Sequence, residues 1–75
     1  MRNELAVMDH TGDTKYMWDK NSPDEIAVAE KTFNKLKKKG YLAYTVKRNG
    51  NKGDIIHEFD PKMEKIIMIP PVVGG

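Results

Sequence analysis

The residues best suited to chemistry are the last two, Gly74 and Gly75, which place a carboxylate at the end of a segment without side chains. Glycine carries no Cβ, so a diglycine is the slimmest ending that a polypeptide offers. Such an ending enters a narrow channel, where a nucleotide or a nucleophile reaches the terminal carboxylate. The sequence therefore indicates chemistry at the C-terminal carboxylate of Gly75.

A metal site is a second chemistry that the polar residues suggest. Asp9, His10, Asp13 and His57 are of the types that ligate metals. A zinc site needs three or four convergent ligands, and these residues have no tight spacing that would bring them together. Aspartates that cap a turn and histidines at strand ends explain them better, so we expect no metal and no cofactor bound by the chain itself.

Nucleophilic catalysis has little support among the side chains. The chain has no cysteine, which excludes a thiol nucleophile. Ser22 precedes a helical pattern, where a serine acts as the helix cap, and Thr11 and Thr14 have no evident base. We therefore expect a protein that is not itself an enzyme.

The lysines between Lys35 and Lys39 suit a phosphate or an acidic partner, but they also complement the dipole at the end of a helix, which is the interpretation we favour. Aromatic residues offer a stacking platform for single-stranded nucleic acid, namely Tyr16, Trp18, Tyr41 and Tyr44. Alternation along strands places half of these rings in the core. The formal net charge of +2 is also far from the basic excess of a dedicated nucleic-acid binder, so we do not expect a nucleic-acid partner.

The diglycine follows an apolar segment that must position it. Ile66–Ile69 is a run of four apolar residues, and a strand covered on both faces lacks the alternation of a strand with one wet face. The run therefore predicts a central strand. Pro70 and Pro71 fix φ and donate no backbone N–H, so they end the strand and keep the chain extended.

A helix from about Pro23 to Lys39 is predicted by its two ends. Ser22 is a good N-cap, proline suits the first helical position, and Glu25 completes a capping box. Gly40 stands where many helices end in a glycine. The apolar stripe recurs at helical spacing and consists of Ile26, Ala29, Phe33 and Leu36.

Apolar and aromatic segments separated by turn residues predict the other strands. Their expected ranges are Leu5–His10, Lys15–Asp19, Tyr41–Lys47 and Asp54–Phe59, with turns at Thr11–Thr14, around Asn49 to Gly53, and at Asp60–Glu64. In the third of these strands Leu42, Tyr44 and Val46 fall on one face. Gly12 is expected to take a positive φ.

This order of elements predicts an α+β fold of the β-grasp type, a mixed sheet of four to five strands with one helix packed across one face. The final strand is then central and parallel to the first. A two-layer sandwich with another strand order is the alternative. Seventy-five residues make one small domain, which we place at residues 1–71, with residues 72–75 as a flexible C-terminal tail.

The expected cellular compartment depends on three features that the sequence lacks: a membrane span, a signal-peptide core and cysteine. No apolar run approaches the ~20 residues of a membrane span, and the N-terminus has no signal-peptide core. The absence of cysteine fits a reducing compartment. We expect a cytoplasmic protein with no membrane partner.

The ending resembles that of the ubiquitin-like sulfur carriers, most closely the small subunit of molybdopterin synthase. Chains of that family typically finish with an apolar strand, Pro-Pro, one or two small or apolar residues, and Gly-Gly. The corresponding residues here are Ile67-Met68-Ile69-Pro70-Pro71-Val72-Val73-Gly74-Gly75. The stretch Asp9–Lys15 matches no sulfur-carrier motif.

The resemblance implies a carrier or modifier protein. An adenylating enzyme of the ubiquitin-activating type would use ATP and magnesium to adenylate the Gly75 carboxylate. Sulfur would then give a thiocarboxylate, or an enzyme thiol would carry the acyl group toward an isopeptide bond, so the further partners are a sulfur-accepting enzyme or an isopeptidase. Val72 and Val73 would contact the channel, and the two prolines would lower the entropy cost of threading.

A docking surface is expected on the sheet. One helix covers one face, so either Ile66 and Met68 or Ile67 and Ile69 lie on the other face. An apolar patch there marks a partner surface, and cover by tyrosine and tryptophan side chains of neighbouring strands is the alternative. The candidate partner-binding residues are Ile67, Ile69, Pro70, Pro71, Val72 and Val73. The alternative function is a small structural or interaction module, for example a phage or plasmid accessory protein, with an incidental Gly-Gly end.

Overall fold

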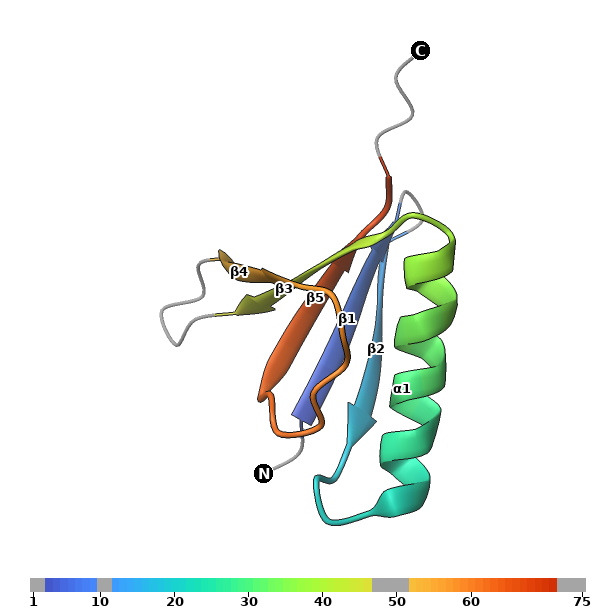
Figure 1. Cartoon of the computed structure of the whole chain (residues 1–75), viewed down its shortest axis with the longest axis vertical. Coiled ribbons are helices and arrows are strands. Elements are labelled where there is room, and N and C mark those ends of the chain that lie inside the picture. Colours follow the sequence, from blue (N-terminus) through green and yellow to red (C-terminus); the bar gives the residue numbers. More distant parts are fainter. Residues whose placement is uncertain (1–2, 10–11, 47–51, 72–75) are drawn as a thin grey trace.

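The computed structural model describes residues 3–9, 12–46 and 52–71, which form one helix and five strands (Figure 1). In chain order these are β1 (Asn3–Asp9), β2 (Gly12–Trp18), α1 (Pro23–Lys38), β3 (Leu42–Val46), β4 (Lys52–Ile56) and β5 (Lys65–Ile69). The tail residues 72–75 and His10 lie outside the described residues. No helix of the described part is long and apolar enough to cross a membrane.

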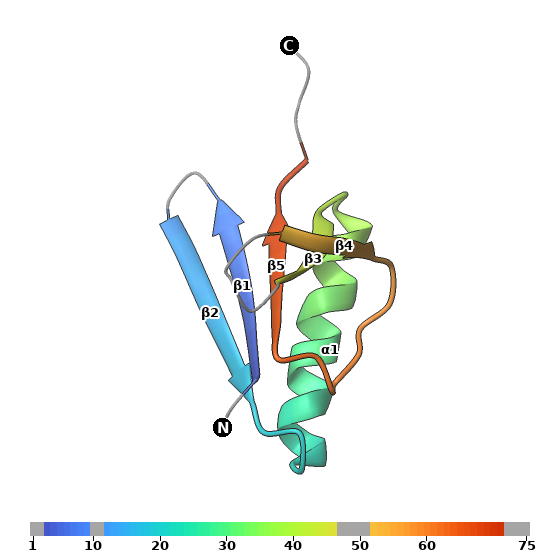
Figure 2. The same cartoon turned by 90° about the vertical axis from the view of Figure 1, so that its left-hand side faces the viewer.

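The strands form a single mixed sheet in the order β2-β1-β5-β3-β4. The last strand, β5, runs parallel to β1 and antiparallel to β3, while β2 and β4 form the two edges. Figure 2 views the sheet from the side opposite the helix, with α1 behind it. The predicted α+β fold, its β-grasp strand order and the central place of β5 are confirmed, and the alternative strand order is excluded.

The register between strands decides which side chains enter the core. Leu5 pairs with Ile66 and Val7 with Met68, and all four are buried on the helix side. Ala43 of β3 joins this layer opposite Met68. From the helix, Ala29 and Phe33 are buried against it, and Ile26 and Leu36 pack partly buried at its margin. The predicted apolar stripe of the helix is therefore confirmed.

Both helix ends form as their residues dictate. The Ser22 Oγ accepts a hydrogen bond from the Glu25 backbone N–H at 3.4 Å, and the Glu25 carboxylate accepts one from the Asp19 N–H at 2.9 Å. The helix ends at Lys38, one residue before the predicted Lys39, which is the C-cap. Gly40 follows with φ +95°, and the Tyr41 N–H donates to the Leu36 carbonyl, as in a Schellman motif.

Several strand boundaries differ from the prediction, most of all the start of β2 and the end of β4. β2 begins at Gly12, whose φ is positive as expected, because its pairing with β1 extends to the Asp9–Gly12 pair. β4 ends at Ile56, so Phe59 lies in the following loop and not in a strand. Its ring packs against those of Trp18 and Phe33, with ring centroids 5.0 and 5.8 Å apart. A loop phenylalanine therefore completes the core between sheet and helix.

A buried asparagine anchors this same loop. The Asn3 side chain donates hydrogen bonds to the Pro61 carbonyl at 3.1 Å and to the Met63 carbonyl at 2.7 Å. The Trp18 indole N–H donates to the Pro61 carbonyl at 3.0 Å. These bonds fix the connection between β4 and β5 against the start of β1 and the end of β2, and so set where β5 enters the sheet.

Candidate functional site

The candidate site consists of the end of β5 and the sheet face that the helix leaves open. After Ile69 the chain leaves the sheet at the half-buried Pro70 and the exposed Pro71, at the end of the sheet where α1 also ends (Figure 1). A Cβ built on Gly40 would lie 3.5 Å from two side-chain atoms of Pro71. The second proline therefore lies beside the turn that follows the helix, which gives the tail a defined starting point.

The residues expected to carry the chemistry lie beyond this point. Val72, Val73, Gly74 and Gly75 are outside the described residues, so their roles stay predictions. Chain geometry still limits their reach. Residues 70 to 75, fully extended, span at most about 20 Å, which is how far the terminal carboxylate can lie from the end of β5.

The open face of the sheet contains Ile67 and Ile69. The register puts Ile66 and Met68 on the helix side, so the choice that the sequence left open is settled. Ile67 lies between Ala6 of β1 and Tyr44 of β3, and Ile69 lies beside Leu42. Tyr44 therefore supplies part of the cover on this face, as the alternative expected. Trp18 does not, because it is buried in the core on the other side.

The open face remains apolar at its surface. Four large apolar side chains on it are between 44% and 48% exposed, namely Met8, Met17, Leu42 and Ile55. Their pairing partners place all of them on the side away from α1. Together with Ile67 and Ile69 they form what we call the open-face patch, which crosses every strand of the sheet. A group of exposed apolar side chains on one face is typical of a protein-binding site.

Charged residues border the patch where β5 begins. The Lys65 ammonium lies 3.3 Å from a carboxylate oxygen of Glu4, across the pairing of β5 with β1. A partly exposed ion pair contributes little to stability. Met17 pairs with Glu4 and therefore lies beside this ion pair, whereas Met8, Ile69 and Leu42 lie at the end of the sheet nearer Pro70.

The predicted polar candidates do not converge. Asp13 lies in the β2 edge and His57 follows β4, the opposite edge of the sheet. Asp9 ends β1, and His10 is outside the described residues. Within residues 3–9, 12–46 and 52–71 no three metal-ligating side chains gather. Ser22 caps the helix through its Oγ, as the sequence indicates.

The aromatic residues do not form a stacking platform. Trp18 is fully buried, Tyr41 is partly buried against the core, and Tyr44 lies on the open face. Tyr16 faces the helix side from β2, because it pairs with the buried Leu5. The rings therefore point to both sides of the sheet.

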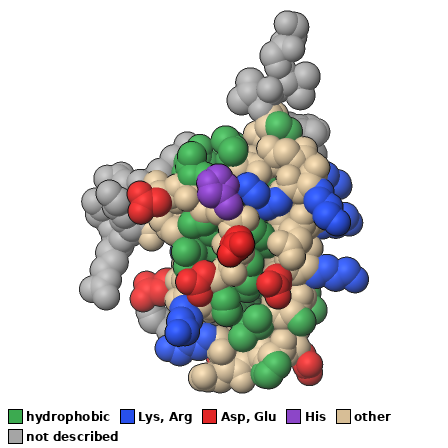
Figure 3. Space-filling view, viewed as in Figure 1, with side chains coloured by type: hydrophobic (Ala, Val, Ile, Leu, Met, Phe, Trp, Pro, Cys, Tyr) green, Lys and Arg blue, Asp and Glu red, His purple; other side chains and the backbone are tan. Residues whose placement is uncertain are grey.

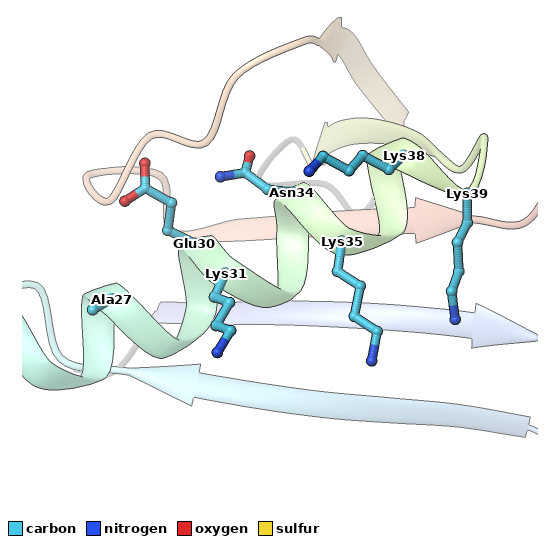
Figure 4. Close-up of a pocket in the computed structure, with 7 residues that line it drawn as sticks. All are labelled: Ala27, Glu30, Lys31, Asn34, Lys35, Lys38 and Lys39. Atoms are coloured by element: carbon cyan, nitrogen blue, oxygen red, sulfur yellow. The ribbon is translucent and has the colours of Figure 1, made fainter.

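The lysines of α1 lie on its outer surface. Figure 3 shows blue side chains gathered over the C-terminal half of the helix. Figure 4 shows Lys31, Lys35 and Lys39 projecting together toward β2, whereas Lys38 projects from the other side of the helix. Lys35, Lys37 and Lys38 lie in the last turn of α1 and Lys39 is its C-cap, which fits the predicted complement to the helix dipole.

Compared with known protein families, curated proteins and solved structures, the chain shows no significant match. The site is therefore interpreted from its own residues. Sequence reasoning missed Met8, Met17, Leu42 and Ile55 as members of the patch. The available signal was that each directly adjoins, in the sequence, a residue that the register turns toward the helix, but this signal becomes readable only when the register is known.

Proposed function

We propose that this chain is a ubiquitin-like carrier or modifier protein, whose Gly75 carboxylate is adenylated by a partner enzyme of the ubiquitin-activating type. The observation that carries the proposal is the way the chain ends: the central strand β5 leads directly into Pro70 and Pro71 and then, in the sequence, to Gly74 and Gly75. A slim carboxylate tail on a rigid base suits threading into a narrow pocket.

The chemistry occurs on the partner enzyme. A carboxylate oxygen of Gly75 attacks the α-phosphorus of ATP, with magnesium held by the enzyme, and pyrophosphate leaves. A sulfur nucleophile or an enzyme thiol then attacks the acyl carbon and displaces AMP. The first gives a thiocarboxylate for a sulfur-accepting enzyme, and the second leads to protein conjugation that an isopeptidase would reverse.

The open-face patch is proposed as the surface that the adenylating enzyme contacts. It contains Ile67 and Ile69 of the strand that ends in the tail, so docking there fixes the origin of the tail relative to the enzyme. The apolar surface that this docking would remove from water contributes about 25 cal/mol per Å². The two prolines reduce the conformational freedom that threading would otherwise remove.

The test is ATP–pyrophosphate exchange with an adenylating enzyme from the same genome. Deletion of Gly75 withdraws the carboxylate by about 3.5 Å, and Gly74→Val widens the tail. Both variants should abolish exchange and product formation while the melting curve stays nearly unchanged. Intact mass of the wild-type product separates a thiocarboxylate from a conjugate.

A second pair of variants tests the patch. Leu42→Glu places a charge on the exposed open face and should lower kcat/KM for exchange about tenfold or more, mainly through KM. Val28→Glu makes the same change at an exposed valine on α1 and should leave exchange unchanged. If wild type is active and the Gly75 deletion exchanges pyrophosphate equally well, the tail is not the site of adenylation. The hypothesis of a small interaction module that uses the patch is then the better supported one.

A further inference from the structure

The open-face patch contains the most accessible sulfur atoms in the described part of the chain. The sequence has no cysteine, so its five methionines carry all of its sulfur. Met8 and Met17 are 45% and 44% exposed, whereas Met68 is fully buried and Met63 packs partly buried against the core. Peroxides oxidise an accessible methionine thioether to a sulfoxide. A peroxide therefore reaches Met8 and Met17 well before Met68.

Met8 lies at the end of the patch from which the tail starts. The parallel register of β1 and β5, continued by one residue past the Met68 pair, sets Met8 beside Ile69. On the other side of Ile69, its pairing partner is Leu42 of β3. The three side chains form an apolar row across three adjacent strands, directly before Pro70 (Figure 1).

Met17 has a different environment at almost the same exposure. It lies on the edge strand β2 and pairs with Glu4. The Glu4 carboxylate is 3.3 Å from the Lys65 ammonium, so Met17 borders an ion pair at the end of the sheet away from Pro70. In protein interfaces, apolar side chains at the centre contribute most of the binding energy and those at a polar rim contribute little. The two methionines therefore differ in neighbours and match in accessibility.

Oxidation changes the polarity of Met8 without entering the core. The thioether sulfur attacks one oxygen of hydrogen peroxide, the O–O bond breaks, and a proton shift leaves the sulfoxide and water. The sulfur loses two electrons and the peroxide is reduced. A flexible apolar side chain thereby becomes a polar one. Because Met8 is exposed on the face away from α1, the added oxygen stays in water and the core packing is unchanged.

A docked partner makes this change costly. In the free protein, water hydrates the sulfoxide oxygen. A partner that covers Ile69 and Leu42 also covers Met8, so the oxygen loses its water and meets apolar side chains. Burial of a polar group without a hydrogen bond is unfavourable. Oxidation of Met8 therefore weakens docking and leaves the free protein folded.

We propose that Met8 is an oxidation site that controls docking on the open-face patch. A peroxide converts its thioether to the sulfoxide and weakens the contact, and a methionine sulfoxide reductase restores it. In the reduction two thiols of the reductant become a disulfide, and the sulfoxide oxygen leaves as water. This inference rests on the proposed function, because it takes the adenylating enzyme as the partner that covers the patch.

The first measurement needs no partner. The full chain is treated with hydrogen peroxide, and peptide mass after digestion follows the gain of one oxygen at each methionine. Met8 and Met17 should be oxidised at similar rates, about tenfold or more faster than Met68. The melting curve of protein oxidised at Met8 and Met17 should stay nearly unchanged. Oxidation of Met68 as fast as that of Met8, or a melting point that falls as Met8 is oxidised, would overturn the proposal.

The second measurement compares docking before and after oxidation. Peroxide is removed, the adenylating enzyme is added, and the KM for the chain is measured by ATP–pyrophosphate exchange. Oxidation of wild type should raise KM about tenfold with kcat nearly unchanged, and a sulfoxide reductase with dithiothreitol should reverse the rise. Met8→Leu keeps an apolar side chain without sulfur, so its KM should be nearly the same before and after peroxide. Met17→Leu is the matched control, and its KM should rise with peroxide as that of wild type does.

The outcomes separate this proposal from the proposed function. If untreated wild type does not exchange pyrophosphate, the proposed function fails and this inference fails with it. If untreated wild type exchanges but oxidation leaves its KM unchanged, only the oxidation site is wrong. The same holds if Met8→Leu stays as sensitive to peroxide as wild type, or if Met17→Leu is the variant that protects.

Discussion

At the scale of single residues, the side chain of Asn3 holds the loop between β4 and β5 in place through two hydrogen bonds. It is 6% exposed and bonds two carbonyls 58 and 60 residues away in the chain. Buried polar groups are stabilising when their hydrogen bonds are complete and costly when they are not. Because the two carbonyls belong to the loop before β5, this asparagine helps to fix the strand that leads to the tail.

Asn3→Ala should lower the free energy of unfolding by about 1–3 kcal/mol, through the loss of both hydrogen bonds and the unpaired Met63 carbonyl that remains. The measurement is urea unfolding followed by tryptophan fluorescence, since Trp18 bonds the same Pro61 carbonyl. Asn34→Ala, on the exposed surface of α1, is the control and should be neutral or slightly stabilising. Equal midpoints for the two variants would show that the Asn3 bonds do not hold the loop.

At the scale of elements, the helix was predictable and several strand boundaries were not. The ends of α1 depend on Ser22, Pro23 and Gly40, which act on their immediate neighbours, so their types suffice. The start of β2 depends on pairing with β1, which lies elsewhere in the chain. Phe59 is apolar enough for a strand, yet it lies in a loop, where its ring packs against those of Trp18 and Phe33 in the core.

The same reasoning applies to the candidate site. The run Ile66–Ile69 predicts a central strand, but a uniformly apolar strand does not reveal which side chains face the helix. The pairing of Leu5 with Ile66 decides it. Asn3 gives no periodic signal at all, because its partners are distant in sequence. The roles of residues 72–75 stay predictions from the sequence.

The helix cap supports a prediction at this scale. Ser22→Ala removes the acceptor of the Glu25 N–H and should lower the free energy of unfolding by about 1 kcal/mol. Ser22→Asp keeps an acceptor at the cap and should stay close to wild type. Thermal and urea unfolding give the comparison. If the alanine and aspartate variants unfold alike at the wild-type midpoint, the 3.4 Å contact contributes nothing to the helix.

At the scale of the whole molecule, the sheet separates two surfaces. The open-face patch lies on one side of the sheet, and α1 covers the other side. A substitution at an exposed position of the patch should therefore leave the packing of α1 unchanged, because the buried core layer lies between them. Effects of the patch on docking are thus testable separately from effects on the fold.

The strand order also predicts how the molecule opens. β5 has a paired strand on each side, so its amides are protected until both β1 and β3 separate, which amounts to global unfolding. Every second amide of β2 points away from β1 toward the free edge and exchanges with solvent directly. Hydrogen exchange followed by NMR should therefore find Ile66, Ile67 and Met68 among the slowest amides and alternate residues of β2 among the fastest strand amides. Exchange in β5 as fast as at the free edge of β2 would contradict the central strand from which the tail is proposed to project.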